Sequence, residues 1–182
     1  MVLLPLLIMM LSGLIEFGFL LNYYLDLIDG TRELARFGAN LDPLTGPEVF
    51  NCTTTKNFYE LLGCLADQVF DKEKQQINLD LVPNDIVVSA FGAKDGFVTE
   101  RYPDADGWSF KGRKVSKFTT DDINGMLDIN APATGMVLVE VFYEYNMILG
   151  LPWITMFVPD TIPLHAYSIM PNTYVEPTPV SP

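Results

Sequence analysis

The chain has 182 residues, a formal net charge of -12 and a mean hydropathy of +0.21, which is high for a protein without a membrane segment. The acidic balance argues against nucleic acid as a partner, because phosphate binding needs clustered Lys and Arg, and the one basic cluster, residues 111–117, is small. Two apolar stretches, residues 1–28 and 147–158, account for most of the hydropathy. We therefore expect one domain of ordinary size on an apolar stalk.

The first stretch is long enough to cross a bilayer, but it carries one carboxylate, Glu16. About 20 apolar residues in a helix span the roughly 30 Å hydrocarbon layer. An ionisable group at that depth costs a few kcal/mol without a partner, so Glu16 needs a neighbour. Helical periodicity continues past the apolar segment, which predicts a single helix from about Met1 to Gly38.

The topology of the stalk depends on two arginines and two cysteines. Arg32 and Arg36 are the first basic residues, and the positive-inside tendency taken alone places the domain after them in the cytoplasm. Few lysines, a Thr/Pro-rich tail and exactly two cysteines indicate an extracytoplasmic domain instead, with a disulfide between Cys52 and Cys64. Two unrelated buried thiols are the alternative. A basic leader that is cut off or lies outside this chain would reconcile the two observations.

The domain begins with a helix and continues with strands. Threonines at 53–55 offer caps for a helix that runs to about Lys72 and carries Cys64. The hydrophobic period then changes to two, and the first two strands form a hairpin around glycines 92 and 96. The predicted strands cover residues 86–91, 97–102, 108–110, 136–145 and 162–170.

The strand over residues 136–145 has the clearest alternation. Leu138 and Phe142 on its second face indicate burial on both faces, so we expect it to be central, with the last strand antiparallel to it. A brief helix is expected from a cap at Thr119 to Leu127.

These elements predict an α+β fold. It consists of a long N-terminal hydrophobic helix over residues 1–40 and a globular head over residues 41–170, with an antiparallel β-sheet and one packed helix. Residues 171–182 are rich in proline, which cannot join a sheet interior, and we expect an extended tail.

Three ordered elements occur in the first forty residues: Leu-Leu-Pro-Leu-Leu at 3–7, Gly-Leu-Ile-Glu-Phe-Gly at 13–18 and Asp-Gly-Thr-Arg-Glu-Leu-Ala-Arg-Phe-Gly at 29–38. An LP-rich run, an I-[ED]-F-G element and an R-E-x-A-R-x-G element follow one another at this spacing in TadE-like proteins of the tight-adherence (Tad) pilus system, which the chain resembles. That family is similar to type IV pilins.

The resemblance implies a structural subunit that polymerises through its N-terminal helix into an extracellular pilus filament. Its partners would be copies of itself, the pilus assembly platform and a prepilin peptidase. The chain would lie in the cytoplasmic membrane before assembly and at the cell surface afterwards. Alternatives are a low-copy minor pilin or assembly factor of such a pilus, and a membrane-anchored extracytoplasmic binding domain.

A helix drawn from lipid into a fibre must bury its apolar surface against other copies, and a carboxylate then needs a donor. We predict that Glu16 meets a polar group of an adjacent subunit, such as an N-terminal amine or a hydroxyl; otherwise it is protonated and accepts from nearby backbone or water. The predicted filament-core residues are those near its face of the helix: Ser12, Gly13, Glu16, Leu20, Tyr23 and Leu27.

The second apolar stretch, residues 147–158, is too short and too broken by Gly and Pro to span a membrane, and too apolar for a free loop. It covers the upper stalk of its own subunit or packs on a neighbouring one. Trp153 and Phe157 in this stretch, with Arg32 and Arg36 of the stalk, are candidate subunit contacts.

Catalytic and metal-binding patterns are weak. The single histidine, His165, lies in a strand pattern without a nucleophile beside it, which indicates a structural role. Residues 104–107 imitate the start of a calcium loop but lack the later ligands, so a turn is favoured. We expect no enzymatic activity, no metal and no cofactor.

Overall fold

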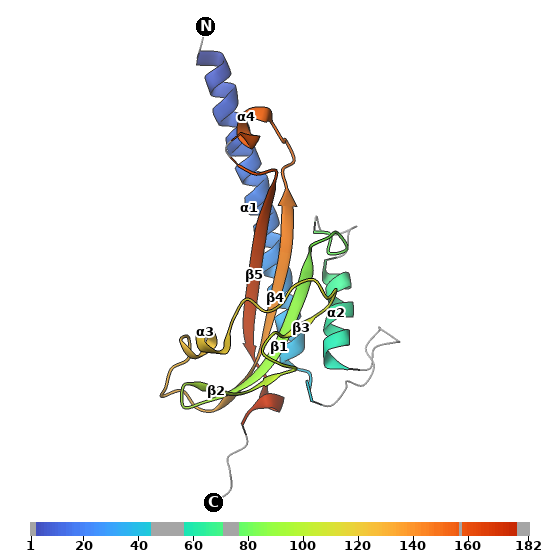
Figure 1. Cartoon of the computed structure of the whole chain (residues 1–182), viewed down its shortest axis with the longest axis vertical. Coiled ribbons are helices and arrows are strands. Elements are labelled where there is room, and N and C mark those ends of the chain that lie inside the picture. The colour runs from blue at the N-terminus through green and yellow to red at the C-terminus, as the bar shows by residue number, and fades with distance from the viewer. Residues whose placement is uncertain (1–2, 45–56, 71–76, 157, 178–182) are drawn as a thin grey trace, which may run out of the picture.

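A long helix that lies along one face of a twisted sheet and projects well beyond it defines the shape of the protein (Figure 1). The computed structural model describes residues 3–44, 57–70, 77–156 and 158–177. Helix α1, Leu3–Ala39, has 37 residues and is about 55 Å long at 1.5 Å per residue. The predicted α+β class is confirmed, and the helix ends within one residue of the predicted position.

The sheet is antiparallel throughout, with strand order β2-β1-β4-β5 and β3 paired beside β1. The predicted hairpin, the short third strand, the central strand and its antiparallel neighbour are all present. The strands are β1 (Asp85–Lys94), β2 (Phe97–Tyr102), β3 (Trp108–Ser109), β4 (Thr134–Asn146) and β5 (Thr161–Pro171).

The hairpin turn differs from its prediction in one detail. Asp95 and Gly96 take the positive φ angles, 53° and 79°, which suit a tight two-residue turn. Gly92, predicted as part of the turn, lies inside β1 where the register to β2 shifts. The first strand is therefore longer than its alternation indicates.

Strand β4 is buried on both faces, as its sequence predicts. Val137, Val139 and Val141 face the side covered by α1 and by α2 (Phe58–Val69), and all three are fully buried. Leu138 faces the opposite side, where it packs with Phe91 of β1 and with Ile123 of α3 (Thr120–Asn124). The sheet is thus the middle of three layers.

Helix α2 is capped by Asn57, whose side-chain oxygen accepts from the Glu60 amide at 2.8 Å. The caps predicted at residues 53–55 lie outside the described residues. Cys64 on α2 is disulfide-bonded, and its predicted partner Cys52 also lies outside the described residues. The brief helix α3 has the predicted cap at Thr119, completed by Asp122 as a reciprocal capping box.

The prediction of an extended tail from residue 171 is wrong for its described part. Asn172 is almost fully buried and donates to the carbonyls of Gly38 and Leu41 at 2.9 and 2.8 Å, which caps the end of α1. Its own amide donates to the carbonyl of Gly135. A 3-10 turn, η1 (Thr173–Val175), follows, so the segment closes the base of the sheet before the residues beyond 177, which are not described.

Candidate functional site

One face of α1 contacts the rest of the chain along most of the helix, and we call its residues the inner stripe. Successive members lie three or four residues apart, the spacing of a single helical face. The upper members contact the loop between β4 and β5, and the lower members belong to the main core under the sheet. The inner stripe consists of Ser12, Glu16, Leu20, Tyr23, Leu27, Gly30, Leu34 and Gly38.

Glycines let α1 approach the head closely at two points. A Cβ atom on Gly30 would lie 2.3 Å from the ring of Phe70, and one on Gly38 would lie 3.2 Å from Val137. Both glycines belong to the third element of the family resemblance. Because the lower half of α1 shares the core of the head, the predicted boundary at residue 40 does not separate two packing units.

Glu16 is 5 % exposed and accepts three hydrogen bonds from its own chain. The Tyr145 hydroxyl donates to Oε1 at 2.5 Å, the Ile148 amide donates to Oε1 at 2.9 Å, and the Leu149 amide donates to Oε2 at 2.8 Å. The prediction placed the donor on an adjacent subunit; the three donors seen here belong to the same chain, and two of them are backbone amides, as in the alternative. The carboxylate instead fastens the end of β4 and the start of the following loop to the stalk.

The segment that Glu16 holds is the second apolar stretch, residues 147–158, which we call the apolar loop. Its turn of helix, α4 (Pro152–Thr155), lies against the projecting part of α1 (Figure 1). The indole of Trp153 donates to Ser12 Oγ at 3.1 Å. Of the two predicted placements, the loop covers its own stalk, although this leaves Ile148 and Met156 49 % and 80 % exposed.

The side chains on the opposite face of α1 are exposed in the described part of the chain, and we call these residues the outer stripe. All are large and apolar, and all are well exposed. Successive members again lie three or four residues apart, which is the spacing found in helices that pack side by side. The outer stripe consists of Leu3, Leu7, Met10, Leu14, Phe17, Leu21 and Leu25.

The predicted filament-core residues therefore divide in an unexpected way. Five of the six belong to the inner stripe, where the chain's own head or loop contacts them. Gly13 has no atom within 4 Å of the position of a Cβ atom, so its surroundings are open. The outer stripe, which the sequence interpretation did not single out, is exposed.

The remaining predicted contacts are less informative. Arg32 is exposed and lies 3.7 Å from Asp29 one turn earlier, an ion pair of small energetic weight at such exposure. Arg36 is also exposed, and its carbonyl accepts from Asn40. Phe157 lies outside the described residues.

A second buried carboxylate, Glu140, lies on the sheet face away from α1 and is paired with the single histidine. Its Oε1 lies 3.1 Å from His165 Nε2, while the Ser116 hydroxyl donates to Oε2 at 2.5 Å. Arg101 donates to the same hydroxyl at 2.7 Å. Burial lowers the pKa of the Arg101 guanidinium, and the charge of Glu140 offsets part of this effect.

This network fastens residues 116–118 to the sheet. The Ser116 hydroxyl and the Lys117 amide donate to Glu140, and the Phe118 carbonyl accepts from Arg101. The structural role of His165 stays a prediction.

A third buried carboxylate, Asp85, works in the same way. It accepts from the amides of Lys111, Arg113 and Lys114 and from the Ser109 hydroxyl, which fixes the residues after β3. The nearby sequence 104–107 is a turn with Gly107 at φ 74°. Among the described residues no group of three metal-ligating side chains comes together.

Comparison of the chain with models of known protein families, with curated proteins and with solved structures finds no match. Within the described part of the chain, α1 is the one helix long and apolar enough to cross a membrane. The candidate functional site is therefore α1 itself, with its two stripes, the carboxylate at Glu16 and the apolar loop.

Proposed function

We propose that the chain is a structural, pilin-like subunit that is anchored in the cytoplasmic membrane by α1 and then polymerises through α1 into an extracellular filament. The outer stripe is the observation that carries this proposal. Its side chains are exposed in the single chain, and an uninterrupted apolar strip of this length is not stable in water. Lipid covers such a strip in a membrane, and copies of the same helix cover it in a fibre.

The contacts of Glu16 support the same sequence of events. A helix that moves from lipid to a protein fibre must not carry an unpaired charge in either place, because an uncompensated buried charge costs several kcal/mol. The three donors of Glu16 belong to its own chain and travel with it. When α1 moves from the membrane into the fibre, the outer stripe exchanges contacts with lipid for contacts with other helices. The hydrogen bonds of Glu16 stay the same.

The resemblance of the first forty residues to TadE-like proteins supports the proposal independently of the packing. Its three elements contain both Glu16 and the glycines at which α1 meets the head. The long helix with an α+β head is also the arrangement that the resemblance implies.

A cysteine placed on each stripe tests the proposal. In the oxidised protein the described residues contain no free thiol, so an introduced cysteine can be followed alone. Leu14→Cys, on the outer stripe, should form dimers on mild oxidation of sheared cell-surface material, and electron microscopy should show filaments. Leu20→Cys, the matched control on the inner stripe, should not form them.

Absence of dimers from Leu14→Cys, or dimers found only in membranes with no filament that contains the chain, would refute polymerisation through this face. The second result would favour the anchored binding domain. If filaments form, the share of the chain in purified fibres distinguishes a major subunit from a low-copy one.

A further inference from the structure

The apolar loop lies beside the part of α1 that would cross a membrane. One apolar groove is lined by Trp153 together with Pro5, Leu6, Ile8 and Met9, and the Trp153 indole donates to Ser12. The amides of Ile148 and Leu149 reach Glu16. All these contacts lie within the first fourteen residues of the helix, whereas a bilayer requires about twenty.

If α1 inserts across the hydrocarbon layer with these contacts in place, the loop must insert beside it. The loop contacts at Ser12 and Glu16 lie within the apolar part of α1 that is long enough to cross a bilayer.

The composition of the apolar loop suits lipid. Residues 147–158 contain no charged side chain. Ile148, Met156 and Val158 are exposed apolar side chains on the surface of the loop. Exposed polar residues, Asn146 and Asp160, flank it and limit how far it can enter.

Most of the described amides in the loop are hydrogen-bonded, which matters in hydrocarbon, where each unpaired N–H costs several kcal/mol. Inside α4 and its ends, the amides of residues 154, 155, 156 and 158 donate to backbone carbonyls. The amides of Ile148 and Leu149 donate to Glu16, and the indole N–H donates to Ser12. The Glu16 carboxylate thus accepts hydrogen bonds from loop amides for which lipid acyl chains offer no acceptor.

We propose that the apolar loop is a second membrane-inserted element, which lies in the hydrocarbon layer beside α1 with lipid acyl chains against Ile148, Met156 and the groove at Trp153. The inference rests on the part of the proposed function that places α1 in a bilayer. It adds that the head is held at the membrane by two elements, and that Glu16 is shielded from lipid by the loop.

Fluorescence of the full chain in phosphatidylcholine vesicles tests this placement. Trp108→Phe leaves Trp153 as the single tryptophan, and vesicles with brominated acyl chains should remove most of its emission, while aqueous iodide should have little effect. Trp153→Phe is the matched control. It leaves Trp108, which packs between Tyr59 and Phe110 in the head and should not be quenched by brominated lipid.

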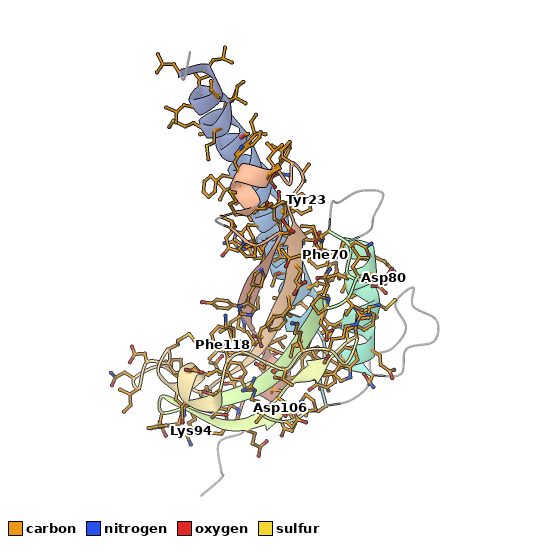
Figure 2. The ribbon with its side chains drawn as sticks, turned by 45° about the horizontal axis from the view of Figure 1, so that its top comes forward. Tyr23, Phe70, Asp80, Lys94, Asp106 and Phe118 are labelled. Carbon is orange, nitrogen blue, oxygen red and sulfur yellow. The ribbon has the colours of Figure 1, made fainter. Side chains whose placement is uncertain are left out.

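A second probe does not depend on tryptophan. Met156→Cys, at an exposed position, is labelled with a polarity-sensitive fluorophore and compared with Lys94→Cys at the hairpin on the far side of the head (Figure 2). Vesicles should shift the emission of the first label, but not that of the second, to the wavelength found in hydrocarbon.

Emission from Trp153 and from the label at 156 that is quenched by iodide and untouched by brominated lipid would overturn the inference. If the protein still floats with the vesicles after an alkaline wash, only the placement of the loop has failed, and the proposed function stands. If the protein does not float with them, the membrane stage of the proposed function fails as well.

Discussion

Replacing Glu16 by glutamine tests how the stalk holds the apolar loop. The glutamine side chain would keep one oxygen for Tyr145 and Ile148 but would turn an NH2 group toward the Leu149 amide, which now lies 2.8 Å from Oε2. A hydrogen bond to a charged group contributes about 1.5 to 3 kcal/mol, and a buried donor without an acceptor costs about 1 to 3 kcal/mol. The saved desolvation of the carboxylate offsets part of this loss.

We expect a net cost of about 2 to 4 kcal/mol, confined to opening of the loop, because the sheet does not depend on this contact. The amides of Ile148 and Leu149 should then exchange with deuterium roughly 30- to 700-fold faster in detergent micelles, at 1.4 kcal/mol for each factor of ten. Tyr145→Phe removes one donor only and should give the smaller effect. Asp29→Asn is the matched control, a carboxylate on the same helix that is exposed.

Unchanged exchange at both amides in the Glu16→Gln protein would refute the reasoning. So would equal acceleration by Asp29→Asn, since that change leaves every hydrogen bond of the loop in place.

Three further predictions concern helix α1 and the head. Gly30→Ala should lower the free energy of unfolding by about 1 to 3 kcal/mol, because the new Cβ meets the Phe70 ring. Gly13→Ala lies in open space and should raise helix stability by about 0.5 to 1 kcal/mol. The two variants should shift the thermal midpoint in opposite directions, and equal shifts would contradict both expectations. Asn172→Ala should cost about 2 to 3 kcal/mol in urea unfolding because the carbonyls at the end of α1 lose their donor, and a change below about 0.5 kcal/mol would show that water replaces it. Burial raises the pKa of Tyr143 to about 12, so the folded protein favours the neutral phenol and the free energy of unfolding should fall as pH rises from about 10 to 12. In a titration of tyrosine absorbance, Tyr143→Phe should remove a late step. Loss of an early step instead would contradict the raised pKa.

The sequence predicted the parts of the fold that depend on local periodicity. The alternation of residues 136–145 identified a central strand, because burial on both faces requires apolar side chains at both parities. The capping box at Thr119 and the end of α1 near Gly38 were likewise predicted from short patterns. Helix, strand and cap preferences act over a few residues, and a sequence displays them directly.

The contacts that form the candidate site are not local. Glu16 accepts from amides more than 130 residues away, and an amide N–H is common to almost every residue, so no sequence pattern distinguishes those two. Asn172 reaches the end of α1 across a similar separation and lies in a proline-rich segment that indicated an extended tail. The outer stripe was overlooked for another reason: every side of the upper helix is apolar, so composition alone does not tell which side the head covers.

The two hydrogen bonds from Asn172 to the end of α1 have a mechanical consequence. Tension applied through the stalk passes at its base into β5, through bonds to the carbonyls of Gly38 and Leu41, before it reaches the chain that follows. Strand β5 runs alongside the helix and is paired with β4 over its whole length, so the load is shared by many bonds pulled in shear. A pull on the stalk therefore loads the hydrogen bonds between β4 and β5 at the same time and does not break them one after another from one end.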